Sequence, residues 1–192
     1  MYKRQIVTHG HVDHYGGARH FQTDYGAHTW ATATDWSVIV ADPHPLAKGV
    51  APPARDRDAA DGGALELGGA TIRFVTTPGH TPGTLSLVIP VHDRGVRRTI
   101  TLWGGTAMPD SSAGVRQMHA SLVKLWAAGE AAGAEGEISS HAFVDDSFGR
   151  FARKAGAARN PFDLGRDGYA RVMAIHGECI LAQAARYDAA GK

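Results

Sequence analysis

The amino-acid sequence predicts an α/β protein built from layers of sheet and helix, and three observations support this prediction. A His- and Asp-rich segment, THGHVDHYGG (residues 8–17), follows a short apolar stretch and ends in two glycines. The pattern then changes to period two over residues 64–104, which is typical of strands. Two long helices are expected at 115–130 and 165–187, the first with an apolar stripe at helical spacing. Strands followed by helices, with a further strand between the helices, are typical of a layered α/β domain.

Length and composition fit one globular domain over residues 1–192. The formal net charge is only +1 and the Lys and Arg residues are scattered, so we expect no nucleic-acid partner. No run of 18 apolar residues is present, so we expect no membrane span. Cys179 is the only cysteine, which excludes an internal disulfide. It lies in the apolar run CILAQAA and is expected to be buried.

The N-terminal part is expected to hold short strands and helices around the His-rich segment. We expect a strand end at residues 5–8, a helix at 16–24, a strand at 27–31 and an apolar helix at 33–40. Residues 42–63 contain four prolines, a charged run and a Gly-Gly pair, and are expected to form a long loop. Such a loop serves either as a wall of a site or as a simple connector, and both remain open.

The rest of the chain is expected to supply a larger sheet and its helices. Gly68-Gly69 between two short alternating stretches predicts a hairpin turn. The expected elements are, in order, hairpin strands at 64–67 and 71–76, strands at 84–91 and 98–104 joined by a turn at 92–95, a helix at 115–130, a strand at 137–140, and helices at 146–155 and 165–187.

The segment HGHVDH predicts a metal site. His9, His11, Asp13 and His14 fall within six residues, and imidazole and carboxylate are ligands that zinc accepts. At this density one short loop can serve two metal ions. His9 and His11 alternate, so an extended segment points them the same way. A tag-like histidine tract is the alternative, but such a tract carries no Asp at this spacing and follows no apolar strand.

Two further histidines lie where a metal site needs them. His80 stands in the turn PGHTPG, whose prolines and glycines fix the backbone. His141, in SSHAFVDD, follows an expected strand end and precedes a helix, and strand ends are where layered α/β proteins collect site residues.

The motifs HGHVDH and PGHTPGTLS resemble those of the metallo-β-lactamase superfamily of zinc hydrolases. The segments LWGGTAMP, SSHAFVD and NPFDLGRDGY are similar to the third, His-rich, di-zinc subclass of metallo-β-lactamases. The resemblance implies an αββα sandwich, here missing much of its N-terminal sheet, because only residues 5–7 precede the motif as strand. We therefore expect an N-terminally truncated chain. The family resemblance suggests the bacterial periplasm or secretion if a lost N-terminal part carried a signal peptide.

The resemblance also implies how the ligands divide between two Zn²⁺ ions. His9, His11 and His80 would hold the first ion, and Asp13, His14 and His141 the second. Three protein ligands per ion leave a position for water or substrate, as a catalytic site requires. The remaining histidines are expected not to be ligands, although His44 could line the pocket; they are His20, His28, His44, His92, His119 and His176.

One departure from the wider superfamily lies at Thr106. Many superfamily hydrolases, including glyoxalase II, carry a metal-bridging aspartate in the equivalent Gly-Asp segment, and threonine is a poor zinc ligand. Asp110 is the nearest substitute, and we expect it not to reach the metals. This departure favours the lactamase-like branch, in which Asp13 alone supplies the carboxylate.

The expected activity is zinc-dependent hydrolysis of a small-molecule substrate. The resemblance implies opening of a β-lactam ring by a hydroxide held between two zinc ions, with Asp13 as the catalytic residue that orients it. Ser86 and Ser139-Ser140 are then expected either to be structural or to support the metal ligands, and Thr8, Thr81 and Ser139 are candidate partners of the ligand imidazoles. Hydrolysis of a lactone, another ester or a thioester remains open, as does an inactive fragment. The sequence leaves the oligomeric state open.

Overall fold

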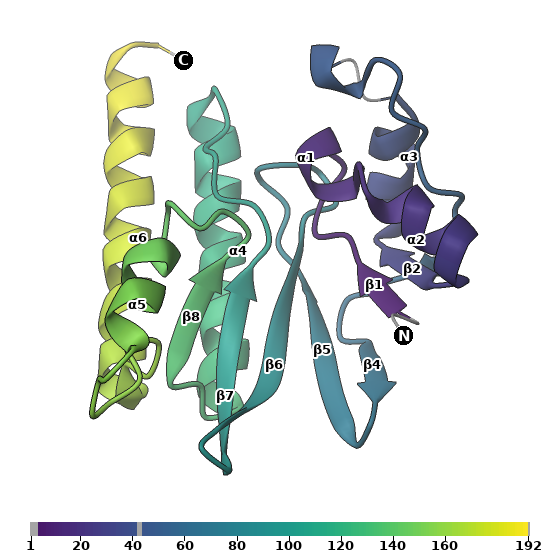
Figure 1. Ribbon diagram of the computed structural model, residues 1–192. Helices are drawn as coiled ribbons and strands as arrows, with labels where there is room; N and C mark the ends of the chain where they lie inside the picture. The colour runs from purple at the N-terminus through teal and green to yellow at the C-terminus, as the bar shows by residue number, and fades with distance from the viewer. Residues whose placement is uncertain (1–3, 42–43, 192) are drawn as a thin grey trace.

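A computed structural model describes residues 4–41 and 44–191, which form four layers in the order helices, sheet, sheet, helices (Figure 1). The first sheet is parallel, in the order β1 (Arg4–Ile6), β2 (His28–Ala31), β3 (Arg57–Asp58). It is accompanied by α1 (Val12–Tyr15), α2 (Ala18–Tyr25), α3 (Ala33–Ala41) and the 3₁₀ turn η1 (Pro45–Ala47).

The second sheet has the order β4–β5–β6–β7–β8. Its antiparallel strands are β4 (Ala64–Leu67), β5 (Ala70–Thr76), β6 (Leu85–Asp93) and β7 (Val96–Trp103), and β8 (Gly136–Ser139) pairs parallel to β7. The remaining helices are α4 (Ser112–Ala131), α5 (Ser147–Lys154) and α6 (Gly165–Ala189). Gly68 and Gly69, both at positive φ, make the tight turn between β4 and β5.

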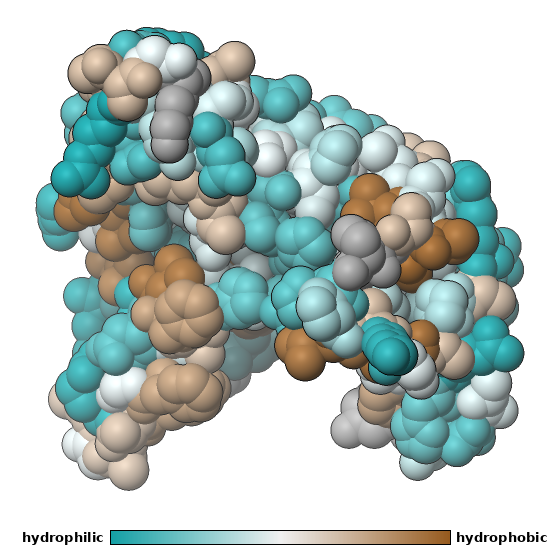
Figure 2. All heavy atoms as spheres, turned by 90° about the horizontal axis from the view of Figure 1, so that it is seen from above, coloured by the Kyte–Doolittle hydropathy of each residue, from teal (hydrophilic) through white to brown (hydrophobic). Residues whose placement is uncertain are grey.

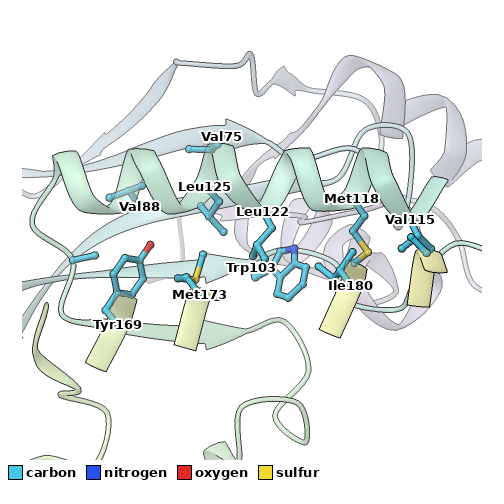
Figure 3. Close-up of a cluster of buried hydrophobic side chains, with 12 residues drawn as sticks. Val75, Val88, Trp103, Val115, Met118, Leu122, Leu125, Tyr169, Met173 and Ile180 are labelled. Atoms are coloured by element: carbon cyan, nitrogen blue, oxygen red, sulfur yellow. The ribbon is translucent and has the colours of Figure 1, made fainter. Parts of the chain in front are cut away.

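The main core lies between the second sheet and helices α4 and α6 (Figure 3). On α4 the buried apolar residues recur every three or four positions, so they form one stripe along the helix. The stripe consists of Val115, Met118, Leu122 and Leu125. Tyr169, Met173 and Ile180 of α6 meet it from the other side. The backbone of α4 is approached closely at Gly129, where a Cβ would clash with the Tyr169 side chain.

Two smaller cores join the first sheet to its neighbours. Trp36 and Ile39 of α3 pack with Val7 and Tyr15 on the helical side of the first sheet. On its other side the first sheet covers part of the second, where the buried residues are Ala59, Leu65, Phe74, Leu85 and Leu87. The layer order therefore confirms the predicted αββα sandwich, with a first sheet of only three short strands.

One face of the molecule is hollowed (Figure 2). In Figure 2, which views the molecule from above, the hollow opens at the lower edge of the picture, and hydrophobic side chains lie to its left and right. A cavity of about 340 Å³ lies between β6–β8 and α5, with Val91, Ile100, Ile138, Phe151 and Phe162 in its wall.

The strand order positions the site. Because β7 and β8 are parallel, with Trp103 opposite Ser139, the chain leaves both strands at the same edge of the sheet. This edge also receives the start of β6 and helix α1, at the top of Figure 1. The turns that carry His80 and His141 therefore meet the HGHVDH segment there.

Most predicted elements are confirmed within a few residues, and some predictions need correction. Residues 42–63 are not all loop, because η1 and β3 lie within them; Asp42 and Pro43 lie outside the described residues. His92 and Asp93 extend β6, so the turn is shorter than predicted. The one-turn helix α1 was not predicted. Within the part of the chain that is described, no helix is long and apolar enough to cross a membrane.

The prediction that Cys179 is buried is wrong, because its side chain is exposed. The buried positions of α6 follow a spacing of three or four, and Cys179 immediately precedes one of them. One residue is a rotation of about 100° on a helix, which turns Cys179 away from the core. The buried residues of α6 are Tyr169, Met173, Gly177, Ile180 and Ala184.

Candidate metal centre

The HGHVDH segment is anchored between the two sheets. Val7 is buried and its N–H donates to the carbonyl of Trp30 (2.8 Å), which continues the pairing of β1 with β2. The N–H of Leu85, at the start of β6, donates to the carbonyl of Thr8 (2.7 Å). His9 follows at once and is fully buried. The backbone therefore holds this histidine in a fixed place before α1 begins.

The first group of potential ligands consists of His9, His11 and His80, whose ligand atoms all lie within 4.8 Å of one another. The Nδ1 of His9 lies 2.7 Å from the carbonyl oxygen of Gly104, and the Nδ1 of His80 lies 3.0 Å from that of Ala107. A carbonyl only accepts, so each Nδ1 must carry the proton and each Nε2 presents a lone pair. These two Nε2 atoms face each other at 3.1 Å with no proton between them. Two lone pairs this close repel each other, and a cation bound between them would remove the repulsion.

The second group consists of Asp13, His14 and His141, again with ligand atoms within 4.8 Å. The two Nε2 atoms are 3.2 Å apart, and the Asp13 carboxylate lies 3.2 Å from His14 Nε2 and 3.7 Å from His141 Nε2. The hydroxyl of Thr8 lies 3.2 Å from Nδ1 of His9 and 3.4 Å from Nδ1 of His14. Thr8 therefore contacts one member of each group, as predicted.

The geometry of both groups fits zinc. Two nitrogen ligands at 2.0–2.1 Å from a tetrahedral zinc ion lie about 3.3 Å apart. The observed separations of 3.1 Å for His9–His80 and 3.2 Å for His14–His141 are close to this value. The groups are also adjacent, since the ring centroids of His9 and His14 are 3.8 Å apart. The structure thus brings together all six residues predicted to be ligands; metal binding by them stays a prediction.

Burial lowers the pKa of three site imidazoles, those of His9, His14 and His80, and so favours their neutral form. Desolvation, followed by repulsion from neighbouring imidazoles, lowers the pKa of His9 to about 2. Desolvation also lowers the pKa of His14 to about 4, partly opposed by Asp13. The pKa of His80 is lowered for the same first reason. Neutral imidazole is the form that binds metal, so protons compete weakly for these side chains.

Acidification is expected to destabilise the metal-free protein. In the unfolded chain His9 and His14 take up protons near pH 6.5, whereas in the folded protein they do so only near pH 2 and pH 4. Below pH 6.5 the unfolded state therefore binds more protons, and the free energy of unfolding falls with pH. Urea unfolding of metal-free protein should give a lower free energy at pH 5.5 than at pH 7.5. An equal or higher free energy of unfolding at pH 5.5 would contradict the lowered pKa values of His9 and His14 in the folded protein.

Asp35 was missed by the sequence analysis. Only 1% of its surface is exposed, and its carboxylate accepts hydrogen bonds from Gly10 N (3.0 Å), Gly83 N (3.0 Å) and the Thr81 hydroxyl (2.7 Å). Burial raises its pKa against these three hydrogen bonds. Asp35 thus fastens the HGHVDH segment and the turn that carries His80 to α3. Its place in an apolar helix, without a neighbouring histidine, gave no signal for this role.

Two predicted partners of the imidazoles make other hydrogen bonds instead. Thr81 donates to Asp35, and the Ser139 hydroxyl accepts from the N–H of His141 (3.1 Å). The orienting groups of His9 and His80 are main-chain carbonyls, which a sequence does not display. The Ser86 hydroxyl is bonded to the Thr77 hydroxyl (2.7 Å) and accepts from Gly104 N (3.1 Å), next to the carbonyl that contacts His9.

The remaining candidates lie outside the two groups. Among the residues that the structure covers, Asp110 joins neither group. His20 pairs with Asp24 on α2, and His28 pairs with Asp56. His92, His119 and His176 also lie outside both groups. His44 lines a cavity whose wall includes His11 and Asp13.

Comparison with known proteins agrees with these observations. Residues 6–94 match the sequence family described as the Metallo-beta-lactamase superfamily. A hydroxyacylglutathione hydrolase of Acidiphilium cryptum (strain JF-5) is 29% identical over 120 residues, or 62% of this chain and 43% of that protein. The chain thus spans less than half the length of this curated relative.

Solved structures share the fold over nearly the whole chain. A subclass B3 metallo-beta-lactamase of Bradyrhizobium japonicum is 24% identical (TM-score 0.76), covering 99% of this chain and 75% of that one. The native FEZ-1 metallo-beta-lactamase of Legionella gormanii is 19% identical (TM-score 0.78; 97% and 75% covered). A subclass B3 enzyme from a soil metagenome library is 26% identical (TM-score 0.73; 99% and 76% covered). With its layered fold and its two His-rich groups, the chain is similar to proteins of the metallo-beta-lactamase superfamily.

Proposed function

We propose that this protein is a zinc-dependent hydrolase that binds two Zn²⁺ ions and opens the β-lactam ring. The main support is that two ligand groups, each with two residues from the HGHVDH segment, lie beside a cavity of about 360 Å³. His11 and Asp13 belong to the groups and also line the cavity, so a substrate there would lie against the metals. The volume falls within the range of ligand pockets.

The residues of this chain would bind the zinc ions and orient the attacking water. When bound, zinc polarises a carbonyl oxygen and lowers the pKa of a coordinated water to about 7. The carboxylate of Asp13 is half-exposed and faces the cavity, where it can accept a hydrogen bond from the attacking water and orient it. The carbonyls of Gly104 and Ala107 hold the rings of His9 and His80 with Nε2 toward the metal. Water adds to the lactam carbonyl carbon, the carbon–nitrogen bond breaks, and the nitrogen takes the proton.

Hydrolysis of a thioester or another ester is the second candidate. It is supported by the 29% identity to a hydroxyacylglutathione hydrolase. Thr106 speaks against it, because the glyoxalase-type site that the resemblance suggests has a metal-bridging aspartate at the equivalent position. Asp110, the nearest carboxylate in the sequence, joins neither described ligand group. We therefore favour the cyclic amide as substrate.

A substrate panel tests the proposal. Zinc-loaded protein is expected to hydrolyse a carbapenem or a chromogenic cephalosporin faster than a lactone or an acyl-glutathione thioester, measured as kcat/KM by absorbance. Dialysis against a chelator should abolish the activity, and added zinc should restore it. Preference for the thioester would favour the second candidate, and absence of any lactam turnover by folded protein with two zinc ions would falsify the first.

A further inference from the structure

The turn that carries His141 contains a buried carboxylate that belongs to neither ligand group. Asp145 lies between β8 and α5, and only 5% of its surface is exposed. Its Oδ2 accepts hydrogen bonds from Ser139 N (3.1 Å) and from the Ser147 hydroxyl (2.8 Å), and its Oδ1 accepts one from Ser147 N (3.1 Å). The side chain of Asp145 therefore joins the end of β8 to the start of α5, and His141 lies between these two points in the chain.

The position of His141 depends strongly on the main chain that carries it. The Nδ1 atoms of His9 and His80 lie against carbonyl oxygens, which orient those rings. For His141 the hydrogen bonds within the described part of the chain involve its backbone N–H and its Nε2, and none reaches Nδ1. Its side chain is also 28% exposed, so surrounding atoms enclose it incompletely. The turn must therefore hold this imidazole in place through the backbone.

Main-chain hydrogen bonds close the turn after His141. The carbonyl of His141 accepts from Val144 N (3.0 Å), and the carbonyl of Ala142 accepts from Ser147 N (2.9 Å). Neither of these two bonds reaches back to β8. The carboxylate of Asp145 makes that connection, so it fixes the closed turn relative to the sheet.

The neighbouring acid, Asp146, has a different environment. Its side chain is 64% exposed and pairs with Arg153 of α5 (2.8 Å). Its backbone has φ of 53°, a conformation that Asn adopts as readily as Asp. Two consecutive aspartates thus differ in burial and in hydrogen bonding, and the exposed one provides a matched control for the buried one.

We infer that Asp145 is a positioning residue for the second ligand group, because its carboxylate holds the turn that places His141 beside His14. Ligands must be held within about 0.5 Å of the productive geometry to bind metal well. The 3.2 Å between the Nε2 atoms of His14 and His141 suits a shared zinc ion, so a shift of the turn would weaken that site first. This inference rests on the proposed function, since it assumes that both groups bind zinc.

Zinc affinity measured one site at a time tests the inference. His80→Ala leaves the second group complete, and His141→Ala leaves the first group complete. Added to His80→Ala, Asp145→Asn should weaken zinc binding by roughly ten- to a hundredfold, because the amide replaces one acceptor oxygen with N–H donors. Added to His141→Ala, the same change should alter the Kd by less than about threefold, since the first group shares no partner with Asp145. Competition with a chromophoric chelator measures both values.

Two further variants separate positioning from general damage to the fold. Asp146→Asn removes a charge one residue away and should change the zinc affinity of neither site by more than about twofold. Ser147→Ala removes one donor to Asp145 and should weaken the second site alone, by about three- to tenfold. Equal loss at both sites in Asp145→Asn, or no loss at the second site, would overturn the inference. The Ser147→Ala variant supplies the same comparison if Asp145→Asn does not fold.

Failure of the proposed function has a different outcome, because zinc binding is measured without substrate. A protein that binds two zinc ions and hydrolyses no lactam would contradict the proposed reaction only. The inference about Asp145 would then stand on the selective loss at the second site. Lactam hydrolysis by the unaltered protein, together with equal loss at both sites in Asp145→Asn, would retain the proposed function and reject the inference. Absence of zinc binding by the unaltered protein would reject both.

Discussion

His80→Ala is expected to lower the zinc content from two ions to about one per chain and to reduce kcat/KM for a β-lactam by roughly a thousandfold or more. The first group would keep only two imidazoles, and His9 Nε2 would lose the partner that it faces at 3.1 Å. The second group, with Asp13, His14 and His141, would remain complete. Metal analysis after gel filtration and steady-state kinetics on the same sample measure both effects.

A matched control for this experiment is available on β6. His92→Ala removes an exposed imidazole that belongs to neither group, and it should keep both zinc ions and full activity. His11→Ala should behave like His80→Ala, because it removes another member of the same group. A His80→Ala protein that binds as much zinc as the unaltered protein would show that the first group is wrongly assigned.

Asp35→Ala is expected to lower the free energy of unfolding of the metal-free protein by about 3 kcal/mol or more. The substitution would leave three buried donors without their acceptor, namely Gly10 N, Gly83 N and the Thr81 hydroxyl. The same donors belong to the loops that carry His9, His11 and His80, so zinc affinity should fall by roughly ten- to a hundredfold. Urea unfolding and competition with a chromophoric chelator measure these quantities.

The comparison variant for Asp35 is Asp24→Ala. Asp24 is an exposed acid on α2 that pairs with His20, and such surface pairs contribute little. Asp24→Ala should change neither stability nor zinc affinity by a measurable amount. If Asp35→Ala behaved in the same way, the carboxylate would not be what fastens the two metal-binding loops together. Loss of stability with unchanged zinc affinity would limit its role to the fold.

Local sequence patterns were sufficient for most elements and for the ligand candidates. Gly68-Gly69 between alternating stretches indicates a hairpin because a tight turn needs positive φ at both positions. Four candidate ligands, in HGHVDH, could be named because His and Asp at such spacing have few other uses, whereas His80 and His141 were named from their places in a turn and after a strand and from the family resemblance. Their division into two groups came from the family resemblance, and the distances around His9 and His14 agree with it.

Interactions that depend on main-chain atoms or on tertiary contacts could not be predicted. Nothing in the sequence shows that the carbonyls of Gly104 and Ala107 orient imidazoles, because every residue has a carbonyl. Asp35 looks like an ordinary polar residue of a helix until the fold brings two loops to it. For Cys179 the apolar neighbourhood was misleading, since exposure on a helix depends on the angular position and not on the average hydrophobicity.

The parallel pairing of β7 and β8 sets the order in which the centre can be completed during synthesis. His9 and His11 emerge early, and His80 follows within the first half of the chain, so the first ligand group is available before α4 exists. His141 comes from beyond β8, and β8 takes its place only after α4 has crossed behind the sheet. On a ribosome the two ion sites would therefore mature in sequence, with the second waiting for the C-terminal part of the chain. A nascent chain paused between His80 and His141 would carry all three members of the first ligand group, but the second group would still lack His141.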